Sequence, residues 1–145
     1  MMKRYNTMCE FWTLKQSHNH VMMGSVDSWF YKALAGIRTT EDAPAFKKIV
    51  IKPFPADGLD SVTASIKTVR GKIVSEWHKT ENGLLLHIEI PFNTKATVYV
   101  PKSRGRTIYA GNKKATEADG IRFIKTENDN TMLKITSGKY DIEVR

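Results

Sequence analysis

The 145-residue chain is 41% hydrophobic, has a formal net charge of +8 and contains one cysteine, Cys9. This size and composition suffice for the core of one ordinary domain, and a lone cysteine excludes an intramolecular disulfide framework and any metal site built from several cysteines. No hydrophobic run approaches the ~20 residues that cross a bilayer and no apolar signal segment follows the first ten residues, so we expect a soluble chain without a membrane span or an address, in a compartment that stays unknown.

The positive charge is spread along the chain rather than concentrated in one basic segment. Lysine and arginine alternate with apolar residues in FKKIVIKP (46–53) and IRFIKT (121–126), as they do on the solvated face of a strand. Because no arginine-rich run, RNA-binding strand signature or zinc spacing accompanies them, we do not expect a nucleic acid partner. Attraction to an acidic polysaccharide fits the charge equally well.

The first predicted element is a helix within residues 17–37. Ser17 or Asn19 can cap it, or Ser25 can cap a second segment, and Gly36 lies where a helix commonly stops. Apolar side chains recur at the i, i+3, i+4 spacing of one helix face, at Val26, Trp29, Phe30, Ala33, Leu34 and Ile37. The first forty residues offer this face no helical core, so either it packs on the sandwich or its partners are missing. In the isolated chain we expect self-association through Trp29 and Phe30.

After residue 45 the hydrophobic period changes from helical to two. Nine short segments alternate in this way, separated by turn residues; they are KKIVIKP, SVTASIKTV, GKIVSEWHKT, GLLLHIEIP, KATVYVP, RTIYA, IRFIKT, TMLKIT and GKYDIEV. No helical crossover lies between them, which favours antiparallel pairing. The sequence therefore predicts a mainly β protein, with a helical segment at 1–44 and an antiparallel β-sandwich of about eight strands at 45–145.

Glu10 is the first candidate for chemistry. It follows Cys9 and precedes Phe11 and Trp12, and such an apolar setting would raise a carboxyl pKa and leave the group poised as acid or base. The alternative is a hydrogen-bonded and inert carboxylate at the edge of a helical segment.

His18, Asn19 and His20 form a second candidate group. On a helix the two histidine side chains would diverge by about 200°, so we do not expect a metal site. Polar residues at this place either cap a helix or hydrogen-bond to sugar hydroxyls in a nearby cleft.

The three tryptophans have different expected roles. Trp29 and Trp77 lie in apolar periodic segments, which favours packing in a core. Trp12 lies beside Glu10 and close to the histidines, and is the candidate for stacking on a pyranose ring.

Several motifs occur together in a characteristic order. TMCEFW (7–12) precedes SHNHVMMGSVDSWFYKALAGI (17–37), and FKKIVIKPFP, VTASIKTVRGKIVSEW and IPFNTKATVYVP follow, up to residue 101. This succession resembles the C-terminal end of bacterial α-L-rhamnosidases of glycoside hydrolase family 78, and the closing ITSGKYDIEV is similar to the final strand of that family.

The resemblance implies a fold and a chemistry. It implies that residues 1–44 are the last helical part of an (α/α) six-hairpin catalytic barrel, and that the chain is an inactive C-terminal fragment of an enzyme. Such an enzyme would hydrolyse terminal α-L-rhamnosyl residues of glycans or glycosides with inversion and without a cofactor. Glu10 would be its general base, His20 would contact the sugar, and the general acid would lie outside this chain.

A reading from another class stays open. The chain could instead be a free-standing, non-catalytic β-sandwich that binds a carbohydrate or a protein through exposed aromatic side chains.

Overall fold

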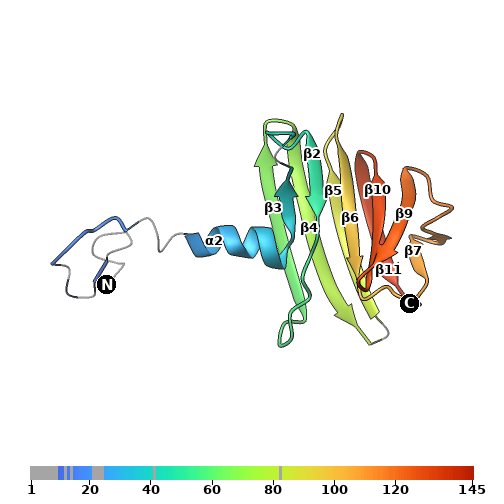
Figure 1. Cartoon of the computed structure of the whole chain (residues 1–145), viewed down its shortest axis with the longest axis horizontal. Helices are drawn as coiled ribbons and strands as arrows, with labels where there is room; N and C mark the ends of the chain where they lie inside the picture. The colour runs from blue at the N-terminus through green and yellow to red at the C-terminus, as the bar shows by residue number, and fades with distance from the viewer. Residues whose placement is uncertain (1–9, 12, 14, 21–24, 41, 82) are drawn as a thin grey trace. The chain divides into compact units, whose positions relative to one another are not determined.

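The computed structural model in Figure 1 describes residues 10, 11, 13, 15–20, 25–40, 42–81 and 83–145. It divides the chain into a first unit, Met1–Phe30, and a second unit, Tyr31–Arg145. Among the described residues, no helix is long and apolar enough to span a membrane.

The helical part is shorter than the sequence predicts. It consists of α2 (Ser25–Trp29) and the π-helix η2 (Phe30–Leu34), and residues 17–20 are not helical. The helical stretch ends before Gly36, as expected, but Ile37 belongs to a strand and not to the helix face. Ile37 is only 2% exposed there, because it packs in the core of the second unit.

Among the described residues of the second unit, eleven strands form two sheets, whose arrangement Figure 1 shows. The first sheet has the order β1 (Ile37–Thr39), β2 (Lys48–Ile51), β6 (Lys95–Pro101), β10 (Asn130–Ile135) and β9 (Ile121–Glu127). The second has the order β3 (Ser61–Thr68), β4 (Gly71–Thr80), β5 (Gly83–Ile90), β11 (Gly138–Val144), β7 (Ile108–Ala110) and β8 (Lys113–Lys114). The predicted mainly β sandwich is thus confirmed, with β1 and β8 in addition to the nine predicted strands.

Most strand pairs are antiparallel, as expected, and one is parallel. β2 pairs with β6 in parallel, with Lys48 opposite Lys95 and Ile51 opposite Val98. Between these strands the chain builds the β3–β4–β5 meander of the other sheet, so it returns to the first sheet in the direction in which it left.

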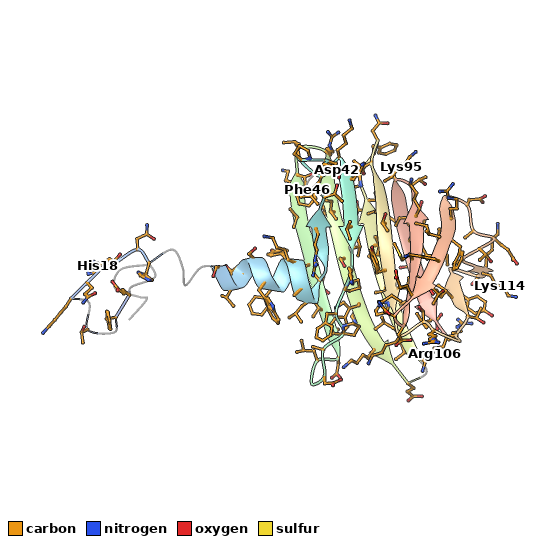
Figure 2. The ribbon with its side chains drawn as sticks, viewed as in Figure 1. His18, Asp42, Phe46, Lys95, Arg106 and Lys114 are labelled. Atoms are coloured by element: carbon orange, nitrogen blue, oxygen red, sulfur yellow. The ribbon has the colours of Figure 1, made fainter. Side chains whose placement is uncertain are left out.

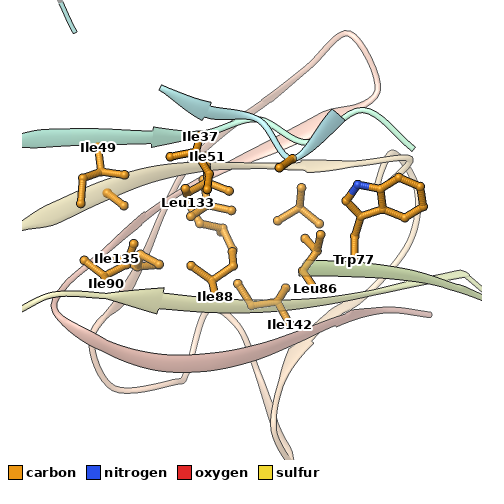
Figure 3. Packing of buried hydrophobic residues seen from close by; sticks show 14 of the residues in the cluster. Ile37, Ile49, Ile51, Trp77, Leu86, Ile88, Ile90, Leu133, Ile135 and Ile142 are labelled. Carbon is orange, nitrogen blue, oxygen red and sulfur yellow. The ribbon is translucent and has the colours of Figure 1, made fainter. Parts of the chain in front are cut away.

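The core lies between the inner faces of the two sheets (Figure 3). On β5 every second residue is buried, from Leu84 to Ile90, which is the alternation of a strand with one face covered. Trp77 is fully buried in this core, so its predicted packing is confirmed. Trp29 is also predicted to pack in a core, and this prediction is wrong. Its side chain is 52% exposed, and no residue of α2 is buried.

Two buried side chains of the second sheet form hydrogen bonds to the residues just before β1. Trp77 donates its Nε1–H to the carbonyl of Leu34 at 2.9 Å, and Ser75 donates its hydroxyl to the carbonyl of Ala35 at 2.6 Å. β1 itself pairs antiparallel with β2, with Ile37 opposite Ile51. Residues 34–39 therefore contribute to the sandwich, although they precede the boundary expected at residue 44.

Candidate functional site

Glu10 and His20 lie close together in the first unit. The backbone N–H of Glu10 donates to the carbonyl of Ser17 at 2.9 Å, which folds the chain back on itself between the two residues. As a result, Oε2 of Glu10 lies 4.0 Å from Nδ1 of His20, and each side chain is 31% exposed. A carboxylate and an imidazole thus meet at the surface of this unit, partly shielded from water.

Gln16 supports the same carboxylate. With its amide nitrogen turned toward Glu10, it donates to Oε2 at 3.1 Å and to Oε1 at 3.3 Å. Hydrogen bonds of this kind fix the orientation of a carboxylate, while its remaining lone pairs stay available to accept a proton or a further hydrogen bond. The group has the chemistry of a general base or of a hydroxyl acceptor.

The other predicted residues of this region differ in what the structure says of them. Trp12 lies outside the described residues, so its stacking role stays a prediction. The backbone N–H of Asn19 donates to the Ser17 hydroxyl at 3.3 Å, so both residues stabilise a turn and not the start of a described helix. His18 belongs to the same unit (Figure 2). In the described part of the chain, no group of three or more His, Cys, Asp or Glu side chains is arranged to hold a metal ion.

The sandwich has hollows of its own, and neither Glu10 nor His20 lines those described here. One, of about 370 Å³, is lined by residues that include Arg38, Lys52 and Phe54. Another, of about 330 Å³, is lined by Lys95, Arg122 and Lys134 together with Gly120, Ile121 and Thr136.

The cations of the second hollow form a group that the sequence analysis did not find. They lie on β6, β9 and β10. In the sequence, their alternation with apolar residues predicts only the ordinary solvated face of a strand. The alternation indicates exposure, but it cannot show that β6 becomes the neighbour of the hairpin that β9 and β10 form. The gathering of these charges depends on the strand order of the sheet.

Comparison with known proteins gives one consistent result. Residues 36–115, more than half of the chain, match the family described as bacterial alpha-L-rhamnosidase C-terminal domain. An alpha-L-rhamnosidase of Formosa agariphila is 26% identical over 129 residues, which are 89% of this chain and 14% of that protein.

Two solved structures are similar to the chain. Alpha-L-rhamnosidase from Dictyoglumus thermophilum has a TM-score of 0.74 and 34% identity, and the match covers 89% of this chain and 14% of that one. Streptomyces avermitilis alpha-L-rhamnosidase, solved in complex with L-rhamnose, has a TM-score of 0.76 and 25% identity, covering 89% and 12%. The chain thus spans about one seventh of the length of the relatives that it matches.

Proposed function

Because the chain belongs to the bacterial alpha-L-rhamnosidase C-terminal domain family, we propose that it acts as the C-terminal part of a longer enzyme that hydrolyses terminal α-L-rhamnosyl residues of glycans or glycosides. The matched residues lie mainly in the sandwich, and the similarity to two rhamnosidase structures extends over 89% of the chain. The segment before the sandwich, with the helical stretch Ser25–Leu34, would then belong to a catalytic barrel whose other helices lie outside this chain.

In this proposal Glu10 is the general base of an inverting hydrolysis. It would accept a proton from the water that attacks the anomeric carbon, while a second carboxyl group protonates the leaving oxygen. The observation that carries this assignment is the 4.0 Å approach of Glu10 and His20, with Gln16 holding the carboxylate. His20 would offer its ring to a hydroxyl of the sugar, and Trp12 would stack on the ring of the same sugar.

The 145-residue chain by itself should be inactive. Inversion needs the two carboxyl groups about 6.5–9.5 Å apart with the attacking water between them, and the partner acid is proposed to lie outside this chain. Without it and without the pocket that orients the sugar, most of the rate acceleration is lost.

The test compares three forms of the longer enzyme on an aryl α-L-rhamnoside. We expect Glu10→Gln to lower kcat by about 10²–10⁴-fold, because the amide is nearly isosteric but cannot accept the proton. We expect His20→Ala to raise KM, because it removes a sugar contact. Asp27→Asn, another change of a carboxylate in the same unit, should keep the parental rate and serves as the matched control.

Two results would contradict the proposal. Parental turnover by Glu10→Gln would remove Glu10 as the base. Proton NMR of the first product should show the inverted anomer of rhamnose, and retention would exclude the inverting mechanism.

A further inference from the structure

The outer face of the five-stranded sheet is strongly basic. On β6, Ala96, Val98 and Val100 are at most 1% exposed, so the alternate residues Lys95, Thr97 and Tyr99 point outward. The same alternation and the strand register place seven cations on this side, which we call the basic face: Arg38, Lys48, Lys52, Lys95, Arg122, Lys125 and Lys134.

Several of these cations are immediate neighbours. Lys48 lies opposite Lys95 on β2 and β6, and Lys134 lies opposite Arg122 on β10 and β9. Like charges directly opposite each other in a sheet destabilise it. An anionic ligand bound between these side chains would reduce this repulsion, which makes the face a candidate for binding.

Some of the positive charge is already neutralised within the chain. Lys48 is hydrogen-bonded to Asp42, and Nζ of Lys125 lies 2.6 Å from Oε2 of Glu127, a hydrogen bond that lowers the pKa of Glu127. In contrast, no carboxylate of the described residues lies within ion-pair distance of Lys95, Arg122 or Lys134.

Three of the cations without such a partner share one concave place. Lys95, Arg122 and Lys134 line the hollow of about 330 Å³, together with Thr136 and the backbone at Gly120. Lys95 lies at the same end of the sandwich as Asp42 and Phe46 (Figure 2). A charged group of a ligand that enters this hollow would meet three cations at once.

The basic face is not a simple consequence of the net charge, because the opposite sheet is different. The outer face of the six-stranded sheet mixes both signs, and several of its charges are paired, although Lys67 lies opposite Lys72 there. His87 lies 2.6 Å from Asp141, Lys139 lies 3.9 Å from Glu89, and Arg145 lies 2.7 Å from Glu143. The excess of positive charge is thus concentrated on one side of the sandwich.

We propose that the basic face binds an acidic polysaccharide, a chain whose sugars carry carboxylate or sulfate groups. Neighbouring strands lie about 4.8 Å apart and alternate residues of one strand about 6.6–6.8 Å, so an extended polyanion can contact several cations together. Between the cations, Thr97 and Tyr99 offer hydroxyl groups to the hydroxyls of the sugars.

The shape of the face favours a polysaccharide over a nucleic acid. The sheet presents neither a helix nor a protruding ribbon that could enter a groove of a duplex. Single-stranded nucleic acids are bound by stacking on exposed aromatic side chains. On the five described strands, Tyr99 points outward with the ammonium of Lys52 over its ring at 5.1 Å, and Phe123, 47% exposed on the edge strand β9, pairs with the inward Leu133, so they form no continuous stacking platform.

This binding is separate from hydrolysis at Glu10 and needs no turnover. It is measured on the 145-residue chain with fluorescent polygalacturonate and fluorescent dextran sulfate, by polarisation, with neutral dextran as the uncharged probe. We expect either acidic probe to bind, the affinity to fall as salt is raised, and neutral dextran not to bind.

Charge reversal locates the site. The triple variant Lys95→Glu, Arg122→Glu, Lys134→Glu should bind at least about tenfold more weakly. The matched control reverses Lys67, Lys72 and Lys114, three exposed lysines of the other sheet, and therefore has the same net charge. It should keep its affinity within about twofold, since these lysines lie away from the basic face.

A thermal transition shows whether the charge-reversed chain folds. If it does not, the neutral variant Lys95→Gln, Arg122→Gln, Lys134→Gln is used to measure the loss of affinity instead. If the two triple charge-reversal variants lose the same affinity for the acidic probes, the proposal is overturned, because the net charge of the chain alone would then explain binding. Tighter binding of a DNA duplex than of both acidic probes would overturn it in favour of a nucleic acid. Equal binding of neutral dextran would overturn the role of charge.

Discussion

At Gly36 the backbone takes a conformation that few other residues accept. Its φ is +73°, and a Cβ atom added there would lie 2.1 Å from the carbonyl carbon of Lys52. The same residue accepts a hydrogen bond from the N–H of Lys52 at 2.9 Å, so the two segments cannot move apart without losing it. We expect Gly36→Ala to lower the free energy of unfolding by about 3–4 kcal/mol, measured by urea denaturation.

Gly58 provides the matched control for this prediction. Its φ is +80°, but no atom lies within 4 Å of the place that a Cβ would take. Gly58→Ala should therefore lower the free energy of unfolding only by the cost of the strained backbone, about 1 kcal/mol. Equal losses at the two positions would show that the contact with Lys52 does not matter.

Trp77 connects the core to the segment before β1. We expect Trp77→Phe to destabilise the protein by about 2–4 kcal/mol, because it leaves a cavity and removes the hydrogen bond to the carbonyl of Leu34. The control is Trp29→Phe, at a half-exposed position, which should change stability by less than about 0.5 kcal/mol. Similar losses in the two variants, measured by urea denaturation, would contradict the structural role of Trp77.

Among the elements, β1 decides where the sandwich begins. We expect the chain 31–145 to unfold in one cooperative thermal transition, and the chain 45–145 to have a Tm lower by about 10 °C or more. The shorter chain lacks Leu34, Ala35 and Ile37, which are buried, and leaves the Ser75 hydroxyl and the Trp77 N–H without their acceptors. Equal Tm values would support the boundary at residues 44 and 45 that the sequence predicts.

The whole molecule is expected to self-associate through the junction of α2 and η2. Trp29 and Phe30 are 52% and 48% exposed, and their rings meet edge to face with centroids 5.6 Å apart. Two copies of this apolar pair can cover each other across a two-fold axis, and burying each large side chain contributes about 1.5–3 kcal/mol. Light scattering should therefore detect dimers that the variant Trp29→Ser, Phe30→Ser does not form.

The control for self-association removes two other exposed apolar side chains. Val69 and Phe92 are 88% and 89% exposed on loops of the sandwich, so Val69→Ser, Phe92→Ser tests whether any hydrophobic surface suffices. This variant should still dimerise. A wild-type chain that stays monomeric at high micromolar concentration would contradict the prediction.

The candidate site was partly visible in the sequence. Glu10 and His20 were selected through the resemblance of their motifs, and the structure brings the two side chains to 4.0 Å. The contact depends on the hydrogen bond from Glu10 to Ser17, and the role of Gln16 depends on the same turn, which no local pattern predicts. The catalytic and sugar-binding roles stay predictions.

By itself, the sequence determined nine strand segments of the sandwich and their turns, because alternation and turn residues are local properties that side-chain burial on one face imposes. It missed β8, which has only two residues, and β1, because Ile37 fits the apolar spacing of the preceding helix. Only the tertiary structure decided the strand order, and with it the basic face. Lys95 meets Arg122 and Lys134 there because β6 pairs with the distant β9–β10 hairpin, and a local pattern does not encode which strands become neighbours.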